Sequence, residues 1–331
     1  MSAAAVQAIA RAVLYEGYLL WPYRRSALKN QQRFTFGGVY PAAYAERGGD
    51  RSQIAMSCLL EGPPHARVEI VLRFLQLVDR HPARRADRAL VPVDELGVAG
   101  ERHLAFDEAA EREVRVEPVR LAELTAALRV PVAQPAGEHL RPLGDDAVLV
   151  RRWQRLEGEL EISAHEVEPG VQRLTIGFAN TSPSASHGRS DALRRTFLSA
   201  HLVVHAADGQ LVSQTDPPDA LRDAAQTCRN DGIWPVLVGE PDARDTVLGS
   251  PIILSDHPAV APESPGDLFD GGEIDALLIH SIRALSDAER EEMRATDPRV
   301  REILDRSLAL SPEQMLDLHG AVRELRPPEG P

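Results

Sequence analysis

The chain has 331 residues, of which 43% are hydrophobic and 26% charged, the composition of a globular protein with a sizeable core and not of a disordered chain. Its formal net charge of -13 argues against nucleic acid or an anionic membrane as a partner, because both attract a basic surface. Two cysteines are too few for a secreted disulfide scaffold. No leader pattern and no apolar stretch long enough to span a membrane is evident, so we expect a soluble, cytoplasmic protein.

The N-terminal part predicts one helix followed by strands. Apolar residues recur every three to four positions over residues 3–20, which is typical of an amphipathic helix. Residues 52–60 and 67–78 read as two strands paired through the short connection "EGPPHA". Gln76 interrupts the apolar face of the second strand, so we expect that strand to end nearby.

Residues 80–150 carry no clear periodicity. We expect a short helix at 118–128 and a proline-rich connector at 131–144. The strongest β signal follows, over 150–213, where apolar residues alternate on both sides of a turn at 168–170. A third strand there, "TFLSAHLVVHA", leads into a predicted hairpin turn at 207–209.

The C-terminal part predicts helices with well-marked starts. Residues 272–285 form an amphipathic pattern. Ser286 and Glu289 form a capping box, Asp297 precedes a proline at the first helical position, and Ser311 begins a Ser-Pro-Glu-Gln start whose helix we expect to end near Gly320 or Arg326.

These elements indicate an α+β fold: an antiparallel β-sheet or β-sandwich core with an N-terminal helix and a C-terminal helical segment. We expect residues 1–130 to pack with 145–260 as one β-rich core, and 261–326 to form the helical segment.

One stretch, "YRRSALKNQQRFTFGGVY" (23–40), departs from the rest of the chain. No acidic residue occurs between Glu16 and Glu46, while four basic residues lie there, including the single lysine, Lys29. All five tyrosines lie in or beside the stretch. Single-stranded nucleic acid is bound by such mixtures, but four cations in an acidic protein make a small footprint, so we expect no nucleic-acid partner.

Two other interpretations of this stretch are open. It can pair with the acidic segment 245–282, which contains no Lys or Arg before Arg283, within the chain or across a homodimer. It can also dock a protein partner, since Tyr and Arg are favoured interface anchors. The predicted docking residues are Tyr23, Arg24, Arg25, Lys29, Asn30 and Arg33. We expect at least half of the aromatic side chains to be core beneath the N-terminal helix.

No catalytic or cofactor motif is evident. The chain has neither a Cys-x-x-Cys nor a His-Glu-x-x-His, and no spaced glycines of a phosphate loop, so we expect no metal and no cofactor. His201 and His205 fall on one strand face about 13 Å apart, which favours solvated histidines. Cys228 follows a helix end beside Arg229, and we expect a buried structural thiol there, with a reactive thiol as the alternative.

Four long segments of the chain are "VLYEGYLLWPYRRSALKNQQRFTFGGVYP", "NDGIWPVLVGE", "LGSPIILSDHPAVAPESPGDLFDGGEIDALL" and "MRATDPRVREILDR". Together they resemble an uncharacterised bacterial family, largely actinobacterial, that is associated with [NiFe]-hydrogenase gene clusters. The resemblance covers most of the chain, rests on long strings, and supplies no catalytic residues. It implies a non-catalytic accessory, maturation or scaffold protein whose partner is a hydrogenase subunit or maturation factor. An enzyme with a site near Cys228 and a structural homodimer are the alternatives.

Overall fold

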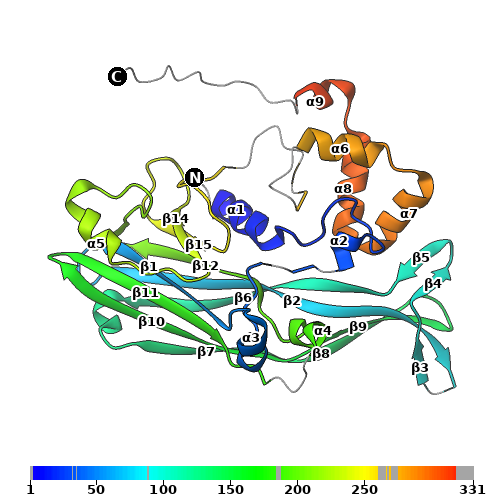
Figure 1. The fold of residues 1–331 in the computed structure, drawn as a ribbon, viewed down its shortest axis with the longest axis horizontal. Coiled ribbons are helices and arrows are strands. Elements are labelled where there is room, and N and C mark those ends of the chain that lie inside the picture. Colours follow the sequence, from blue (N-terminus) through cyan, green and yellow to red (C-terminus); the bar gives the residue numbers. More distant parts are fainter. Residues whose placement is uncertain are drawn as a thin grey trace. The chain divides into compact units, whose positions relative to one another are not determined.

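The computed structural model describes residues 3–31, 33–34, 36–87, 89–183, 188–259, 266, 268–269 and 275–317. The chain divides into two compact units, each described by itself below. The first contains residues 1–18 and 32–259, and the second contains 19–31 and 260–331. Figure 1 shows the strands of the first unit and the helices of the second. The segment 19–31, expected to belong to the N-terminal part, therefore lies with the C-terminal helices.

The first unit consists mainly of two antiparallel sheets. The five-stranded sheet has the order β13 (Gln210–Leu211), β1 (Gln53–Glu61), β11 (Val171–Asn180), β10 (Leu156–Glu168) and β7 (Leu128–Gln134). The eight-stranded sheet has the path β14 (Trp234–Leu237), β15 (Thr246–Ser250), β12 (Leu198–Ala207), β2 (Arg67–Ala86), β9 (Ala147–Trp153) and β8 (Gly137–Pro142), with β3 (Ala89–Pro92) and β6 (Phe106–Arg120) also paired to β2. A small hairpin joins β4 (Glu95–Val98) and β5 (Glu101–Leu104).

The two large sheets share one hydrophobic core. Alternate residues of β1 and β2 contribute to it from opposite sheets, including Met56 and Leu60 from β1 and Ile70 and Phe74 from β2. Because successive side chains of a strand point to opposite faces, alternate residues lie in the core and the residues between them lie outside it. The expected α+β fold with an antiparallel core, an N-terminal helix and C-terminal helices is confirmed.

Helix α1 (Ala3–Tyr15) covers the outer face of the eight-stranded sheet. Its buried Ala10 and Val13 pack in one cluster with Val71 of β2 and Val203 of β12. Since β-strand side chains alternate, the residues of β12 that do not face the core face this helix. The hydroxyl of Ser199 donates to the carbonyl of Val13 at 3.0 Å and ties the helix to the strand.

Short helices and turns complete the first unit. They are α3 (Ala42–Gly48), η1 (Leu121–Leu124), α4 (Arg189–Leu193), η2 (Asp219–Leu221) and α5 (Arg222–Gln226). The second unit contains α2 (Leu28–Gln31), α6 (Asp275–Arg283), α7 (Asp287–Thr296), α8 (Pro298–Ala309) and α9 (Pro312–Asp317). No described helix is long and apolar enough to cross a membrane.

The capping predictions for the C-terminal helices are confirmed. Ser286 and Glu289 exchange hydrogen bonds at the start of α7, and the Asp297 carboxylate accepts from the backbone N–H of Arg299 at the start of α8. Ser311 and Gln314 do the same for α9. The predicted ends of the last helix, near Gly320 or Arg326, lie outside the described residues.

Three strand predictions are wrong. β1 and β2 lie in different sheets and do not pair, because stacking face to face buries the apolar face of both strands in one core. β2 continues past Gln76, whose buried amide donates to the carbonyl of Gln154 and accepts from Arg112, so the polar residue is satisfied inside the sheet. β13 pairs with β1 instead of β12, so the turn at 207–209 carries the chain from one sheet to the other.

Two predictions between 118 and 144 are also wrong. The expected helix is a single 3₁₀ turn, η1, between the end of β6 and the start of β7. The expected connector at 131–144 contains β7 and β8. Both strands are sheet edges, where a proline costs no inward hydrogen bond, so Pro131 and Pro142 do not prevent pairing.

Candidate functional site

The first part of the predicted docking stretch is a loop closed by Asn30 in the second unit. The Asn30 amide donates to the carbonyls of Leu20 and Arg24 at 2.8 and 3.1 Å, and its oxygen accepts from the N–H of Leu20 at 2.9 Å. Three hydrogen bonds from one buried side chain fix the two ends of the loop against each other. The short helix α2 is thus presented on a backbone with a defined conformation.

Helix α7 holds this loop through its acidic side chains. Arg24 pairs with Glu289 at 3.1 Å and lies 3.9 Å from a carboxylate oxygen of Glu292. The other oxygen of Glu292 accepts from the N–H of Ser26 at 2.9 Å. Hydrogen bonds from Ser286 lower the pKa of Glu289, which keeps that carboxylate ionised. Arg24 is therefore engaged within the unit.

Tyr23 is a buried anchor of the same loop. Its side chain is fully buried, and its hydroxyl donates to the carbonyl of Leu268 at 2.6 Å. The Trp21 ring meets it edge to face at 6.2 Å. Tyr15, Tyr18 and Tyr40 are buried too, as expected for aromatics that contribute to the core.

Arg33 lies in the first unit and is 8% exposed. Its guanidinium carbon lies 4.1 Å from the centre of the Phe106 ring, 4.9 Å from Phe34 and 5.5 Å from Tyr18. The group also donates to the backbone carbonyls of Tyr18 and Asp107. Stacking and hydrogen bonding of this kind hold a buried guanidinium in place.

The predicted docking residues consequently separate into two groups. Tyr23, Asn30 and Arg33 are buried, which removes their side chains from a docking surface. Arg25 is half-buried and Lys29 is exposed, and beside Lys29 the side chain of Leu28 is 82% exposed. Leu28 was not singled out from the sequence, where its only signal was its place next to the single lysine.

Among the described residues, the carboxylates that pair with Arg24 lie outside the acidic segment 245–282. Those carboxylates come from α7, after the segment ends. Glu263, Asp267, Asp270 and Glu273 lie outside the described residues. The hydrogen bond from Tyr23 to the carbonyl of Leu268 is a contact between the docking stretch and this segment within the second unit.

Both cysteines are unpaired and buried. Burial, with a smaller effect from the nearby Cys228, raises the pKa of Cys58 to about 12. Burial also raises the pKa of Cys228, although the charge of Arg173 acts in the opposite direction. A thiol with a raised pKa is a poor nucleophile, so this geometry favours the structural interpretation of Cys228.

His201 corrects the expectation of two solvated histidines. It is fully buried on the α1 side of β12, and its Nδ1 lies 2.9 Å from the carbonyl of Ser199. Burial, together with the charge of Arg73, lowers the pKa of His201 to about 4. His205 is exposed, as expected. In the part of the chain that the structure describes, no group of three or more His, Cys, Asp or Glu side chains could hold a metal ion.

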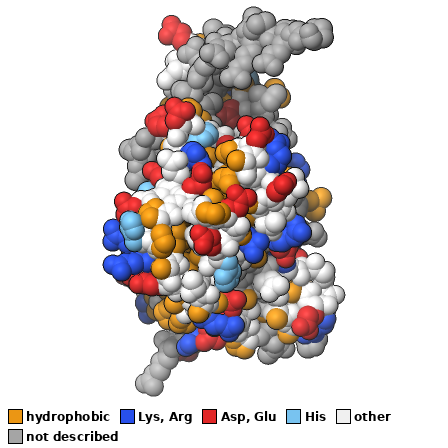
Figure 2. Space-filling model, turned by 90° about the vertical axis from the view of Figure 1, so that its left-hand side faces the viewer, with side chains coloured by type: hydrophobic (Ala, Val, Ile, Leu, Met, Phe, Trp, Pro, Cys, Tyr) orange, Lys and Arg blue, Asp and Glu red, His pale blue; other side chains and the backbone are white. Residues whose placement is uncertain are grey.

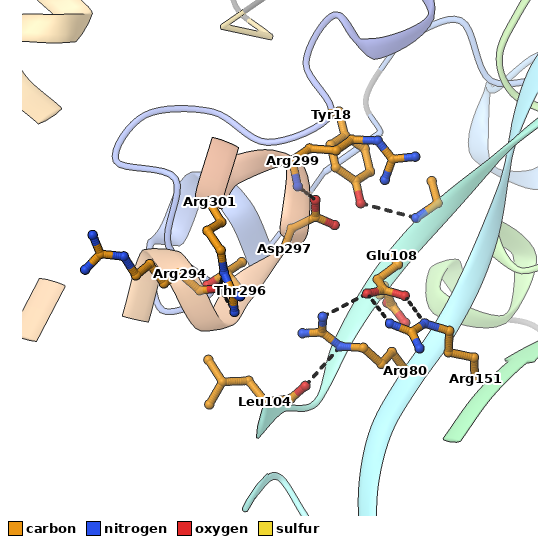
Figure 3. Close-up of polar contacts among 12 residues, drawn as sticks. Tyr18, Arg80, Leu104, Glu108, Arg151, Arg294, Thr296, Asp297, Arg299 and Arg301 are labelled. Atoms are coloured by element: carbon orange, nitrogen blue, oxygen red, sulfur yellow. Dashed lines mark hydrogen bonds and ion pairs between the residues drawn. The ribbon is translucent and has the colours of Figure 1, made fainter. Parts of the chain in front are cut away.

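A buried ion-pair network, missed from the sequence, connects three strands of the eight-stranded sheet. Figure 3 shows Glu108 of β6 between Arg80 of β2 and Arg151 of β9. The carboxylate accepts from Arg80 at 2.8 Å and from Arg151 at 2.6 and 3.2 Å. Burial opposes ionisation, but these bonds and charges dominate and lower the pKa of Glu108. The network satisfies its buried charges and has a structural role.

No protein-family model matches this chain, and no curated protein matches it either.

Proposed function

We propose that this chain is a non-catalytic accessory, maturation or scaffold protein of a [NiFe]-hydrogenase system, and that it docks a hydrogenase subunit or maturation factor through the tip of the loop 19–31. The observation that carries the docking part is the exposed pair Leu28 and Lys29 on a loop whose backbone is held by Asn30. The hydrogenase part is supported by the resemblance of the four segments described above.

The tip combines the properties of a compact interface anchor. An exposed leucine supplies apolar area, which drives association when it is removed from water. The positive charge of Lys29 beside it favours a partner surface that carries carboxylates around an apolar depression. Because the loop is already ordered, docking loses less conformational entropy than it would with a flexible peptide.

On the face that Figure 2 shows, acidic, basic and hydrophobic side chains are interspersed, without an extended field of one charge. A small, defined contact therefore fits the proposal better than recognition through a broad charged surface.

The single lysine makes this proposal directly testable. Lys29 carries the only side-chain amine in the chain, so an amine-reactive cross-linker reports on this tip and on the N-terminal amine alone. The full chain is co-expressed with the subunits and maturation proteins of a [NiFe] hydrogenase, purified, and cross-linked. We expect a cross-link from Lys29 to one of these proteins. Lys29→Arg keeps the charge and abolishes the cross-link while binding persists.

The variant that tests docking is Leu28→Ser with Lys29→Glu. We expect at least about a tenfold loss of affinity for the captured partner, since each exposed anchor contributes about 1 kcal/mol or more. The matched control is Arg47→Glu, at an exposed position of α3 in the first unit. Unchanged binding and unchanged melting of the double variant would overturn the proposal. Cross-links from Lys29 to Lys29 of a second copy, with no hydrogenase protein captured, would replace it with the homodimer.

A further inference from the structure

An open cleft of about 410 Å³ lies in the first unit, between α1 and the outer face of the eight-stranded sheet. Its apolar wall consists of Val6 of α1, Val71 of β2, Val203 of β12 and Val238, which follows β14. Clefts of several hundred Å³ with apolar walls and a few convergent polar groups are typical of small-molecule sites. All of these elements belong to one unit, so the cleft is a property of that unit alone.

A chain of three hydrogen-bonded side chains forms one side of the cleft. The hydroxyl of Thr246 donates to Asp245 Oδ1 at 2.9 Å, and Thr246 Oγ1 lies 3.1 Å from His205 Nδ1. Because the hydroxyl proton is directed to the carboxylate, Thr246 accepts from His205, which places the imidazole proton on Nδ1. His205 Nε2 is then an acceptor, and Thr246 has no proton left for a ligand.

Most of the charged side chains in the cleft lining are carboxylates, which accept hydrogen bonds. The lining contains three carboxylates, Glu69, Glu240 and Asp245, against one guanidinium, Arg115. Arg115 donates to Glu69 at 3.2 Å and to Glu113 at 2.8 Å, and these two carboxylates raise its pKa. Arg115 is thus engaged by Glu69 and Glu113, while Asp245 and His205 present hydrogen-bond acceptors to the cleft.

We infer that this cleft binds a small organic cation with an apolar body, an aliphatic amine or guanidine. The valine wall takes the alkyl part, and the acceptors at Asp245 and His205 receive the N–H donors of the cationic head. A neutral alcohol of the same length supplies a single donor and no charge, and an alkyl carboxylate is repelled by the rim. The inference does not depend on the proposed docking function, since the tip of α2 belongs to the other unit.

The test is binding of three six-carbon probes to the purified full chain: hexylamine, hexanol and hexanoate, each at pH 7, measured by calorimetry and by ligand-observed NMR. We expect hexylamine to bind at least about tenfold more tightly than hexanol, a difference of about 1.4 kcal/mol, and hexanoate not to bind. Equal binding of hexylamine and hexanol, or no binding of hexylamine, would overturn the inference.

Two variants locate the site. Asp245→Asn preserves the shape of the side chain and removes a rim charge, so we expect hexylamine affinity to fall about tenfold, whereas Asp242→Asn, an exposed acid of the same loop outside the lining, leaves it unchanged. Ala243→Phe places a ring at the cleft without changing its charge, and we expect it to abolish binding with the melting temperature retained. Full hexylamine affinity in Ala243→Phe, or equal losses in both aspartate variants, would show that the amine binds elsewhere.

Discussion

The guanidinium carbon of Arg33 lies 4.1 Å from the centre of the Phe106 ring, and the two residues belong to segments more than seventy positions apart in the chain. The same group donates to the carbonyls of Tyr18 and Asp107. One buried cation therefore fastens the start of the first unit's main segment to the beginning of β6. A planar guanidinium suits this position because it stacks on a ring while its edges donate.

We predict that Arg33→Lys lowers the free energy of unfolding by about 2 kcal/mol. An ammonium group cannot stack on Phe106 and reach both carbonyls together, so at least one buried acceptor loses its donor. Urea unfolding followed by circular dichroism measures the loss as a lower midpoint at an unchanged slope. The matched control is Arg129→Lys, at a side chain 65% exposed whose ion pairs are on the surface. An Arg33→Lys midpoint equal to that of the control would contradict the structural role of Arg33.

A second prediction concerns the pH dependence of stability that His201 imposes. Its pKa of about 4 in the folded protein lies below the usual value of 6.5, so the unfolded chain binds a proton first as the pH falls. The contribution of neutral His201 to the free energy of unfolding is complete above pH 6.5. It decreases as the pH falls from 6.5 to 4, and no further change occurs below pH 4. The total decrease is about 3 kcal/mol, from about 1.4 kcal/mol for each pH unit.

Comparison of variants isolates this effect from the titration of carboxylates. Unfolding free energies measured from pH 7 to 4 should decrease more steeply for the wild type than for His201→Gln. His205→Gln, at an exposed histidine four positions later on the same strand, should retain the wild-type slope. Identical slopes for all three proteins would mean that His201 is accessible to protons in the folded state.

The third prediction is that neither thiol reacts rapidly in the native protein. A pKa of about 12 in place of 9 leaves Cys58 with about a thousandfold less thiolate at pH 7, and its burial blocks access as well. Iodoacetamide labelling followed by peptide mass spectrometry should modify Cys58 and Cys228 only after urea is added. Rapid native labelling of Cys228 at pH 6 to 7 would contradict the structural interpretation and restore the enzyme hypothesis.

Local signals in the sequence predicted the helix starts and the central hairpin. Ser286 with Glu289, and Asp297 before Pro298, satisfy backbone groups within one turn of their own position, so three or four residues contain the whole interaction. The β10–β11 hairpin is similarly local, with Gly170 at φ 76° in its turn.

Pairing between distant strands was not predictable in the same way. The choice of β11 as the partner of β1, instead of β2 a few residues away, depends on the burial of two whole strand faces. Gln76 was interpreted as a strand end because its partners, Arg112 and Gln154, are distant in the chain. A polar residue in a strand is compatible with the core when the fold supplies its hydrogen bonds.

For the candidate sites, too, the sequence predicted local features but not contacts between distant residues. The composition of 23–40 identified an unusual stretch, but Asn30 and Tyr23 were assigned to docking because burial is not visible in a list of residue types. The cleft was not foreseen, since Val6, Val71, Val203 and Val238 lie in four separate segments of the chain.

The discontinuous second unit has a consequence for synthesis on the ribosome. Tyr23 and its hydrogen-bond acceptor Leu268 are 245 residues apart, and α7, which holds the loop through Glu292, is made later still. At a translation rate of about 5–20 residues per second, the rest of the second unit is synthesised on the order of 10–50 s after the loop, and only then can the unit fold. During that interval Tyr23 and Leu28 are exposed on the nascent chain, where a chaperone can reach them.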